Sequence, residues 1–467
     1  MTPSASPSTP DAAPGMLTRL RTQAAAMLAG VDDRARTQRN AIFAFSVRVV
    51  SAALLYLSQA ALARWMGSFE FGIYVFVWTW VLLLGGLSHG GLATAMIRLV
   101  PEYAARDEHD LLRGLLVGGR LLAVALATLI AGLAGAMLWA FSTHLSGPYL
   151  MPLFLALVCV PLYALSDVQD GIGRGKAWMG LALVPPYILR PLLLLATMAA
   201  AWLAGLPMTA VTAVGAAIVA TWLAAITQTL MISRRLAGEP QASGPRRFAV
   251  GTWLATALPL LVIGGCEMLL QTADVLIISR YMSPSDVAIY YAAAKTMALV
   301  LFVQYAVGSA VANRFAALNA VGDEAGLART LADAVRWTFW PSLAAALVIL
   351  ALGRPLLALF GPQFVAAYPV MFILIVGFLV RAAMGPAEYL LNMLGEQRRC
   401  ARALAIAAAV DIALALLLVP SFGLIGAAIA TATAYATAAL LAAREVRRRL
   451  GMPISIFSVA WRANAGN

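Results

Sequence analysis

The sequence predicts an all-α polytopic membrane protein with about twelve transmembrane helices in two pseudo-symmetric six-helix lobes. Three observations support this fold class. Hydrophobic residues make up 62% of the 467 residues and charged residues only 12%, whereas soluble domains contain about 45–50% apolar and about 25% charged residues. The apolar residues form runs long enough to cross a bilayer. One motif also recurs 216 positions further along the chain.

The same composition excludes several classes of protein. A cytosolic enzyme or a secreted disulfide scaffold would not have a mean hydropathy of +0.85. The three cysteines (Cys159, Cys266 and Cys400) form no metal-binding or redox spacing, so we expect no metal site and no disulfide framework. The sequence contains no Walker A, HExxH or GxSxG motif, so we expect no catalytic residues and no cofactor.

Twelve hydrophobic runs predict twelve helices, because unpaired backbone groups are not tolerated in hydrocarbon. An outer-membrane barrel would instead show alternating segments of about ten residues, and the chain has none. The expected spans are residues 41–65, 72–97, 114–141, 149–170, 178–204, 210–232, 250–279, 288–311, 336–359, 366–393, 403–421 and 423–443.

The distribution of Lys and Arg predicts the orientation. If the N-terminus is cytoplasmic, the cytoplasmic segments contain 25 basic residues, and the opposite segments contain only Arg64, Arg280 and Arg354. Basic residues favour the cytoplasmic side of membrane helices, so both termini are expected there. This distribution explains the net charge of +12 without nucleic-acid binding.

The spans and the charged segments divide the chain into five parts. We expect a disordered or amphipathic cytoplasmic N-terminus, a first lobe of six spans, a cytoplasmic linker rich in Gly, Pro and Arg, a second lobe of six spans, and a basic cytoplasmic tail. The expected boundaries are 1–40, 41–232, 233–249, 250–443 and 444–467.

The recurring motif identifies the two lobes as copies of one unit. Residues 64–74 read RWMGSFEFGIY and residues 280–290 read RYMSPSDVAIY, with Arg, Met, Ile and Tyr identical. The register continues into the next loop, where polar residues also match. Because six spans separate the copies, both enter the membrane from the same side, as in two-lobed transporters. Within the motif, Ser283 to Asp286 predicts a helix capping box, and we expect Glu70 and Asp286 to be structural.

Charged residues inside the spans are the candidate functional residues. A charge at the bilayer centre costs at least about 2.5–3.5 kcal/mol, so it should face a wet cavity or a partner. Arg190 is flanked by three prolines, which kink helices where they line cavities. Arg381 could instead be neutralised by Glu388, seven residues later. The candidate substrate-binding cations are Arg48, Arg190, Lys295 and Arg381.

Three further residues are candidates for coupling transport to H⁺ or Na⁺. Glu267 and Asp411 lie deep in their spans, and buried carboxylates either bind cations or pair with a base. His89 lies in a glycine-rich stretch (residues 85–91) that should permit a bend, where a packed histidine is the alternative to a proton relay. Asp274 is closer to a span end, and we expect it at the membrane interface.

Several loop motifs resemble a known family. They are LARWMGSFEFGIYVF (62–76), GLATAMIRLVPEY (91–103), FGPQF (360–364), LGEQ (394–397) and PSFGLIGAA (420–428). The chain resembles the polysaccharide transporters of the multidrug/oligosaccharidyl-lipid/polysaccharide (MOP) superfamily, of the O-antigen flippase type. This resemblance covers nearly all of residues 40–450.

The resemblance implies two six-helix lobes in a V around a central cavity, and translocation of an undecaprenyl-diphosphate-linked oligosaccharide across the bacterial inner membrane. It implies the lipid bilayer, the lipid-linked oligosaccharide, and polysaccharide polymerase or assembly proteins as partners. Two alternatives within the superfamily remain open, a drug/cation antiporter coupled to H⁺ or Na⁺ and a peptidoglycan-precursor flippase. A membrane glycosyltransferase or polymerase would need a larger outer loop than this chain has.

Overall fold

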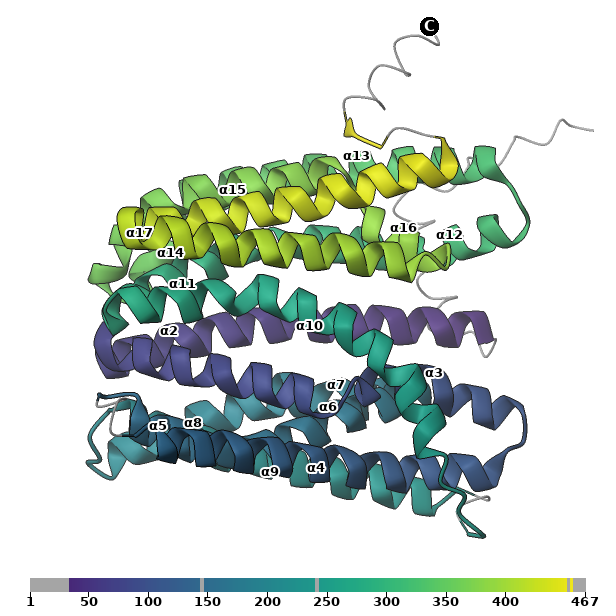
Figure 1. Ribbon diagram of the computed structural model, residues 1–467, viewed down its shortest axis with the longest axis horizontal. Coiled ribbons are helices and arrows are strands. Elements are labelled where there is room, and N and C mark those ends of the chain that lie inside the picture. Colours follow the sequence, from purple (N-terminus) through teal and green to yellow (C-terminus); the bar gives the residue numbers. More distant parts are fainter. Residues whose placement is uncertain (1–32, 143–146, 240–242, 452–453, 457–467) are drawn as a thin grey trace, which may run out of the picture.

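Helices account for nearly all of the residues that the computed structural model describes, which are 33–142, 147–239, 243–451 and 454–456. No strand occurs within these ranges, and the predicted all-α fold is confirmed. Most of the proposed N-terminal segment and the end of the tail lie outside the described residues. Figure 1 shows the N-terminal helices below, the C-terminal helices above, and α2 and α10 running between them.

The helices follow the order of the predicted spans. The N-terminal half contains α2 (Asp33–Ser88), α3 (Leu92–Ala105), α4 (His109–Ala140), α5 (Leu150–Ala156), η1 (Leu157–Cys159), α6 (Val160–Gly175), α7 (Met179–Val184), the π-helical turn η2 (Pro185–Leu189), α8 (Arg190–Leu203) and α9 (Ala210–Ala237). The C-terminal half contains α10 (Val250–Tyr281), α11 (Pro284–Ala298), α12 (Leu301–Ala320), α13 (Glu324–Ala351), α14 (Gly353–Ala358), η3 (Pro362–Ala367), α15 (Tyr368–Ala383), α16 (Ala387–Met393) and α17 (Gln397–Leu450).

Two of these helices each contain two spans. The backbone of α2 leaves helical geometry at Gly67 (φ 76°) and that of α17 at Gly423 (φ 57°), positions that favour glycine because it has no Cβ. Ten helical stretches among the described residues are long and apolar enough to cross a membrane. Dividing the two long stretches at these glycines gives the predicted twelve.

The ninth and tenth spans differ from the sequence prediction. Instead of covering 336–359, the ninth helix α13 runs from Glu324 to Ala351, and residues 353–358 form the separate helix α14. Hydropathy marks only the part of a helix that crosses hydrocarbon, so it missed the charged first turns of α13. The tenth span is interrupted between α15 and α16, where Gly385 has φ 61° and precedes a proline that cannot donate a backbone hydrogen bond.

The structure repeats with the offset seen in the sequence. The second part of α2 begins after Gly67, and α11 begins at the equivalent Pro284. The predicted capping box is present: the Ser283 Oγ accepts a hydrogen bond from the Asp286 N–H, and the Asp286 carboxylate accepts one from the Ser283 N–H. In the first copy, Glu70 accepts a hydrogen bond of 2.7 Å from the Ala210 N–H at the start of α9. Both acids therefore stabilise helix N-termini.

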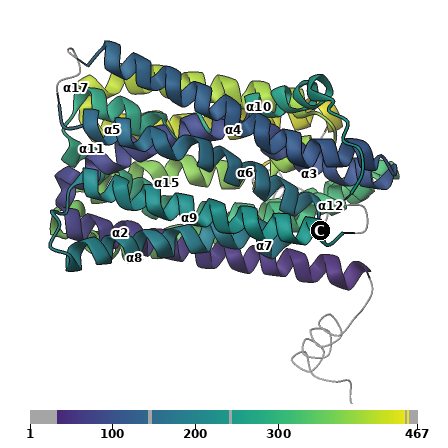
Figure 2. The same ribbon diagram turned by 90° about the horizontal axis from the view of Figure 1, so that it is seen from below.

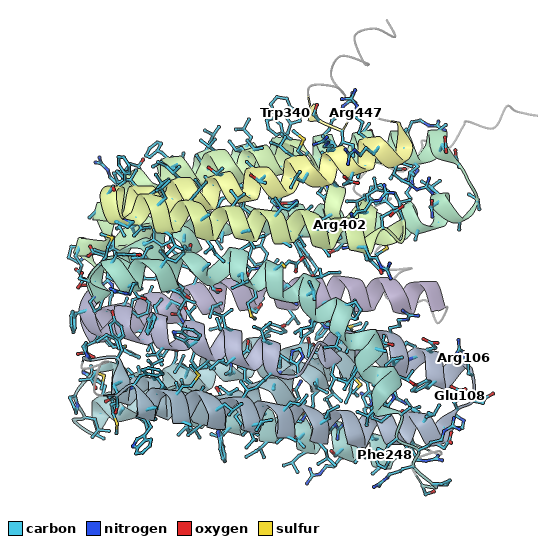
Figure 3. The ribbon with its side chains drawn as sticks, viewed as in Figure 1. Arg106, Glu108, Phe248, Trp340, Arg402 and Arg447 are labelled. Atoms are coloured by element: carbon cyan, nitrogen blue, oxygen red, sulfur yellow. The ribbon has the colours of Figure 1, made fainter. Side chains whose placement is uncertain are left out.

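Apart from α10, which packs against helices of both halves, the two halves contact each other mainly at one end of the molecule. A single buried core includes Phe71 and Tyr74 from the first half together with Tyr290 and Phe360 from the second. Toward the other end, one core lies within the C-terminal half, and a second core combines residues of the N-terminal half with Trp253 and Ala257 of α10. The labelled Arg106, Glu108, Arg402 and Arg447 lie toward that other end (Figure 3), which is the end of the basic loops. We refer to the joined end as the outer end, according to the topology that the sequence predicts.

Hydrogen bonds across the outer end link the halves directly. Arg64 donates to the carbonyl oxygens of Leu359 (2.7 Å) and Ala358 (2.9 Å). The Tyr56 hydroxyl lies 3.0 Å from the Thr296 hydroxyl. Gly72 is in such close contact with the backbone of Pro284 that a Cβ at Gly72 would overlap its carbonyl group. The outer end is closed in this conformation.

We expect Gly72→Val to open the outer end, because the added side chain has no room beside Pro284. Leu55 lies below this contact and lines the central cavity. In a variant without native cysteines, Leu55→Cys should react severalfold more with a membrane-impermeant maleimide added from outside when Gly72→Val is present. Gly132→Val is the control, since a Cβ there meets no atom within 4 Å. Unchanged labelling would show that this contact does not hold the outer end closed.

Candidate functional site

A cavity lies between the two halves on the inner side of the closed end. It has three parts, of about 220, 350 and 490 Å³. Arg48 on α2 lines all three parts, and Lys295 on α11 lines two of them. The parts therefore adjoin each other around these cations.

The wall from the N-terminal half carries Arg48 and Arg190. The guanidinium of Arg48 lies 4.4 Å from the centroid of the Tyr187 ring and 5.8 Å from that of Tyr305. Arg190 lies 5.0 Å from the Tyr163 ring and 5.8 Å from the Trp78 ring. Neither arginine has a carboxylate within ion-pair distance among the described residues. Both guanidinium groups are half-buried and available to an anionic ligand.

The prolines beside Arg190 produce the predicted irregularity. Pro185 and Pro186 begin the π-helical turn η2, which ends where α8 begins at Arg190. Proline removes backbone hydrogen-bond donors, and π-helical turns occur frequently at functional sites. This turn directs Pro186, Tyr187 and Arg190 to the cavity.

The wall from the C-terminal half carries Lys295 and Arg381. Lys295 Nζ lies 5.2 Å from the centroid of the Tyr291 ring. Arg381 forms an ion pair of 2.6 Å with Glu388, so the neutralisation anticipated from the sequence occurs. The Arg381–Glu388 ion pair connects the end of α15 to α16 across the break in the tenth span. Glu267 lines the same part of the cavity as Arg381.

Two buried carboxylates belong to the same half of the chain, Asp274 on α10 and Asp411 on α17. Asp411 is 1% exposed, and neither of its oxygens has a hydrogen-bond partner among the described residues. It interacts electrostatically with Asp274 on α10. Asp274 is 5% exposed and lines the cavity together with Lys295. Asp274 is buried near the outer end of α10, beside residues of α11 and α17, and its place at the membrane interface stays a prediction.

A tyrosine and a threonine lie close to the two carboxylates. The Tyr290 hydroxyl lies 3.1 Å from the Thr431 hydroxyl, and Tyr290 interacts with both Asp274 and Asp411. Two carboxylates with hydroxyl groups beside them provide oxygen ligands of the kind that hard cations and protons use.

His89 lies away from the central cavity. It is buried at the break between α2 and α3, where Gly90 and Gly91 have positive φ angles, so the predicted bend is confirmed. Its Nδ1 accepts a hydrogen bond of 3.2 Å from the Gly91 N–H, and its Nε2 lies 3.7 Å from a carboxylate oxygen of Asp167.

The structure thus brings the four predicted cations and Glu267 to one cavity, with Asp411 buried on α17 and His89 apart. The aromatic lining was not predicted. The sequence did contain a pattern that could have predicted it. Tyr187 precedes Arg190 by three residues and Tyr291 precedes Lys295 by four, and this spacing places each pair on one helix face. The cavity tyrosines are Tyr56, Tyr187, Tyr291, Tyr305, Tyr389 and Tyr435.

Among the described residues, twelve apolar spans in two halves surround a central cavity, which is the architecture of a multi-pass membrane protein of the transporter class. Two family models match the chain. Residues 37–318 match the family described as polysaccharide biosynthesis protein, and residues 259–417 match the MatE family. The chain belongs to the polysaccharide biosynthesis protein family, in the MOP superfamily. A sequence search of curated proteins gives no match.

Solved structures with the same fold are transporters of the MOP superfamily. A multidrug resistance MATE family transporter in its inward-facing conformation is 15% identical, with a TM-score of 0.73 over 86% of this chain and 94% of that chain. An outward-facing multidrug resistance MATE family transporter is 15% identical, with a TM-score of 0.63 over 91% and 97%. A Pyrococcus furiosus MOP transporter, described by the reverse polarity of its binding pocket, is 14% identical, with a TM-score of 0.61 over 91% and 97%.

Proposed function

We propose that this protein is a flippase that moves an undecaprenyl-diphosphate-linked oligosaccharide across the bacterial inner membrane. The observation that carries this proposal is that four cations, from both halves of the chain, line one cavity together with aromatic rings. A diphosphate needs fixed positive charge when it leaves water. Tyrosine rings offer apolar faces and hydroxyl groups to a sugar.

Transport would proceed by alternating access between the two lobes, with 41–232 and 250–443 as the proposed units and 233–249 as the linker. The closed outer end and the higher TM-score with the inward-facing transporter support an inward-facing state. The excess of basic residues on one side supports cytoplasmic termini. The substrate would then be taken from the cytoplasmic leaflet and released to a polysaccharide polymerase on the other side.

Coupling to H⁺ or Na⁺ is part of this proposal. Asp411 is the leading candidate because its buried oxygens have no hydrogen-bond partner among the described residues and it interacts electrostatically with Asp274. Glu267 in the cavity and His89 at the helix break are the further candidates that the sequence indicated.

A drug/cation antiporter is the second candidate function. The match of residues 259–417 to the MatE family and the acids Glu267 and Asp274 in the cavity lining favour it. A peptidoglycan-precursor flippase would share the lipid diphosphate, so the two flippases differ only in the glycan.

Reconstituted liposomes distinguish these functions. We expect the protein to move a fluorescent undecaprenyl-diphosphate oligosaccharide between leaflets, because the cations compensate its diphosphate. Movement is measured as loss of accessibility to dithionite, and a fluorescent quaternary ammonium dye tests antiport in the same vesicles. Uptake of the dye without movement of the lipid would contradict the proposal. A lipid carrying the peptidoglycan glycan tests the remaining alternative.

A further inference from the structure

A second cavity, of about 610 Å³, lies on the outside of the N-terminal half. It is bounded by the start of α2, by α7 with η2, and by the end of α9, which lie beside each other in Figure 2. Aliphatic and aromatic side chains form most of its lining. Phe43 and Met231 are 43% and 47% exposed, so the groove opens to the surface that the bilayer covers. We call it the α2/α7/α9 groove.

Only one turn of chain separates this groove from the cationic cavity. Pro185 and Leu189 of η2 line the groove, whereas their neighbours Pro186 and Arg190 line the cavity. On α2, Phe43 lines the groove and Arg48, about one and a half turns further, lines the cavity. The π-helical turn η2 is therefore a wall shared by the groove and the cavity.

The contact between α2 and this wall is small. Val47, Ala182 and Leu183 form a core cluster of their own, with Tyr187 packed against it. This cluster is separate from the large cores that hold the rest of the half together. Few buried side chains thus resist separation of α2 from η2, and Tyr187 connects the cluster to the Arg48 guanidinium.

The cytoplasmic end of the groove carries positive charge at the expected depth of the lipid headgroups. The Arg235 guanidinium lies 4.7 Å from the Trp178 ring centroid, and Lys176 Nζ lies 5.9 Å from it. Lys176 is also paired with Glu239 at 2.8 Å. Tryptophan and basic residues are enriched at membrane interfaces, so the apolar part of the groove lies at the depth of the acyl chains of the same leaflet.

We propose that the α2/α7/α9 groove binds the polyprenyl chain of the substrate while its diphosphate passes between α2 and η2 to Arg48. This inference rests on the proposed flippase function and adds the place where the lipid tail is held. The tail must stay in hydrocarbon throughout transport, because moving it into the wet cavity would expose a long apolar surface. An apolar groove that is open to the bilayer and adjoins the cationic cavity meets this requirement.

Photo-cross-linking from α9 tests the inference with a matched pair of positions. Met231 lines the groove, and Leu230 is the adjacent residue on the same helix, is 52% exposed, and does not line it. With p-benzoylphenylalanine at position 231, we expect cross-linking to radiolabelled undecaprenyl-diphosphate oligosaccharide at least fivefold above that from position 230. Met231→Trp should slow flipping severalfold by filling the groove, whereas Leu230→Trp should not.

Equal cross-linking of the substrate from both positions, or cross-linking of phospholipid alone from position 231, would overturn the inference. A third probe at Phe302, which lines the cationic cavity, separates this failure from that of the proposed function. Cross-linking from Phe302 with normal flipping, but none from position 231, would refute the groove alone. Absence of substrate cross-linking from both sites, with no flipping, would refute the flippase function itself.

Discussion

Replacing Arg48 with alanine is expected to reduce glycan export about 10- to 100-fold. A hydrogen bond to a charged group contributes about 1.5–3 kcal/mol, and each ~1.4 kcal/mol corresponds to about tenfold in rate. Arg48 lines all three parts of the cavity and has no ion pair among the described residues. Arg190 lines one part of the cavity and likewise has no ion pair among the described residues, so Arg48→Ala combined with Arg190→Ala should abolish export. Arg190→Lys should retain part of the activity, since it keeps the charge but loses the bidentate fork.

Arg381 should behave differently from these two arginines. Because Arg381 is paired with Glu388, Arg381→Ala leaves a buried carboxylate without its partner. We expect it to lower the amount of folded protein as well as export.

Export is measured as glycan at the cell surface, normalised to the amount of the protein in the membrane. Arg280→Ala is the matched control, because Arg280 stacks on Tyr281 near the outer end and does not line the described parts of the cavity. Normal export in alanine variants of Arg48, Arg190, Lys295 and Arg381, made singly and together, would contradict the role of the cations.

Much of the fold follows from features that a sequence displays directly. The length of the apolar runs predicted the twelve spans. The repeat predicted that α11 and the second part of α2 begin at equivalent positions, as they do in the structure. The prediction was wrong for residues 353–358, which were assigned to the ninth span although they contain Arg354 and Pro355 and form a short helix outside α13. Hydropathy does not distinguish a residue in the lipid from one packed beneath an outer loop.

The sequence predicted the charged residues of the site but not their arrangement in space. A cation inside a span costs free energy and therefore indicates a function, so Arg48 and Arg190 could each be identified as candidates from their positions alone. The burial of Asp274 could not be predicted, because it depends on how α10 packs against α11 and α17. The electrostatic interaction of Asp274 with Asp411 likewise involves residues more than 130 positions apart, and no local pattern predicts it.

Asp411→Asn is expected to abolish ion-driven transport while leaving the protein folded. Lys295 supplies positive charge near Asp274, but Asp411 has no hydrogen-bond partner among the described residues, so a second carboxylate charge here needs a proton or a cation. Asparagine keeps the size of Asp411 but removes its negative charge. The substrate would then still equilibrate between leaflets, but an imposed H⁺ or Na⁺ gradient would no longer accelerate it. Asp274→Asn should have the same effect, because the same site loses half of its charge.

The measurement is flipping of the fluorescent lipid-linked oligosaccharide in liposomes with either a Na⁺ gradient at constant pH or a pH gradient without Na⁺. The gradient that accelerates the unmodified protein identifies the coupling ion. Asp286→Asn serves as the control, since Asp286 caps α11 at the outer end and should change stability without changing the response to the gradient. If Asp411→Asn and Asp274→Asn both retain the full gradient-driven rate, this pair of carboxylates does not couple ion movement to transport.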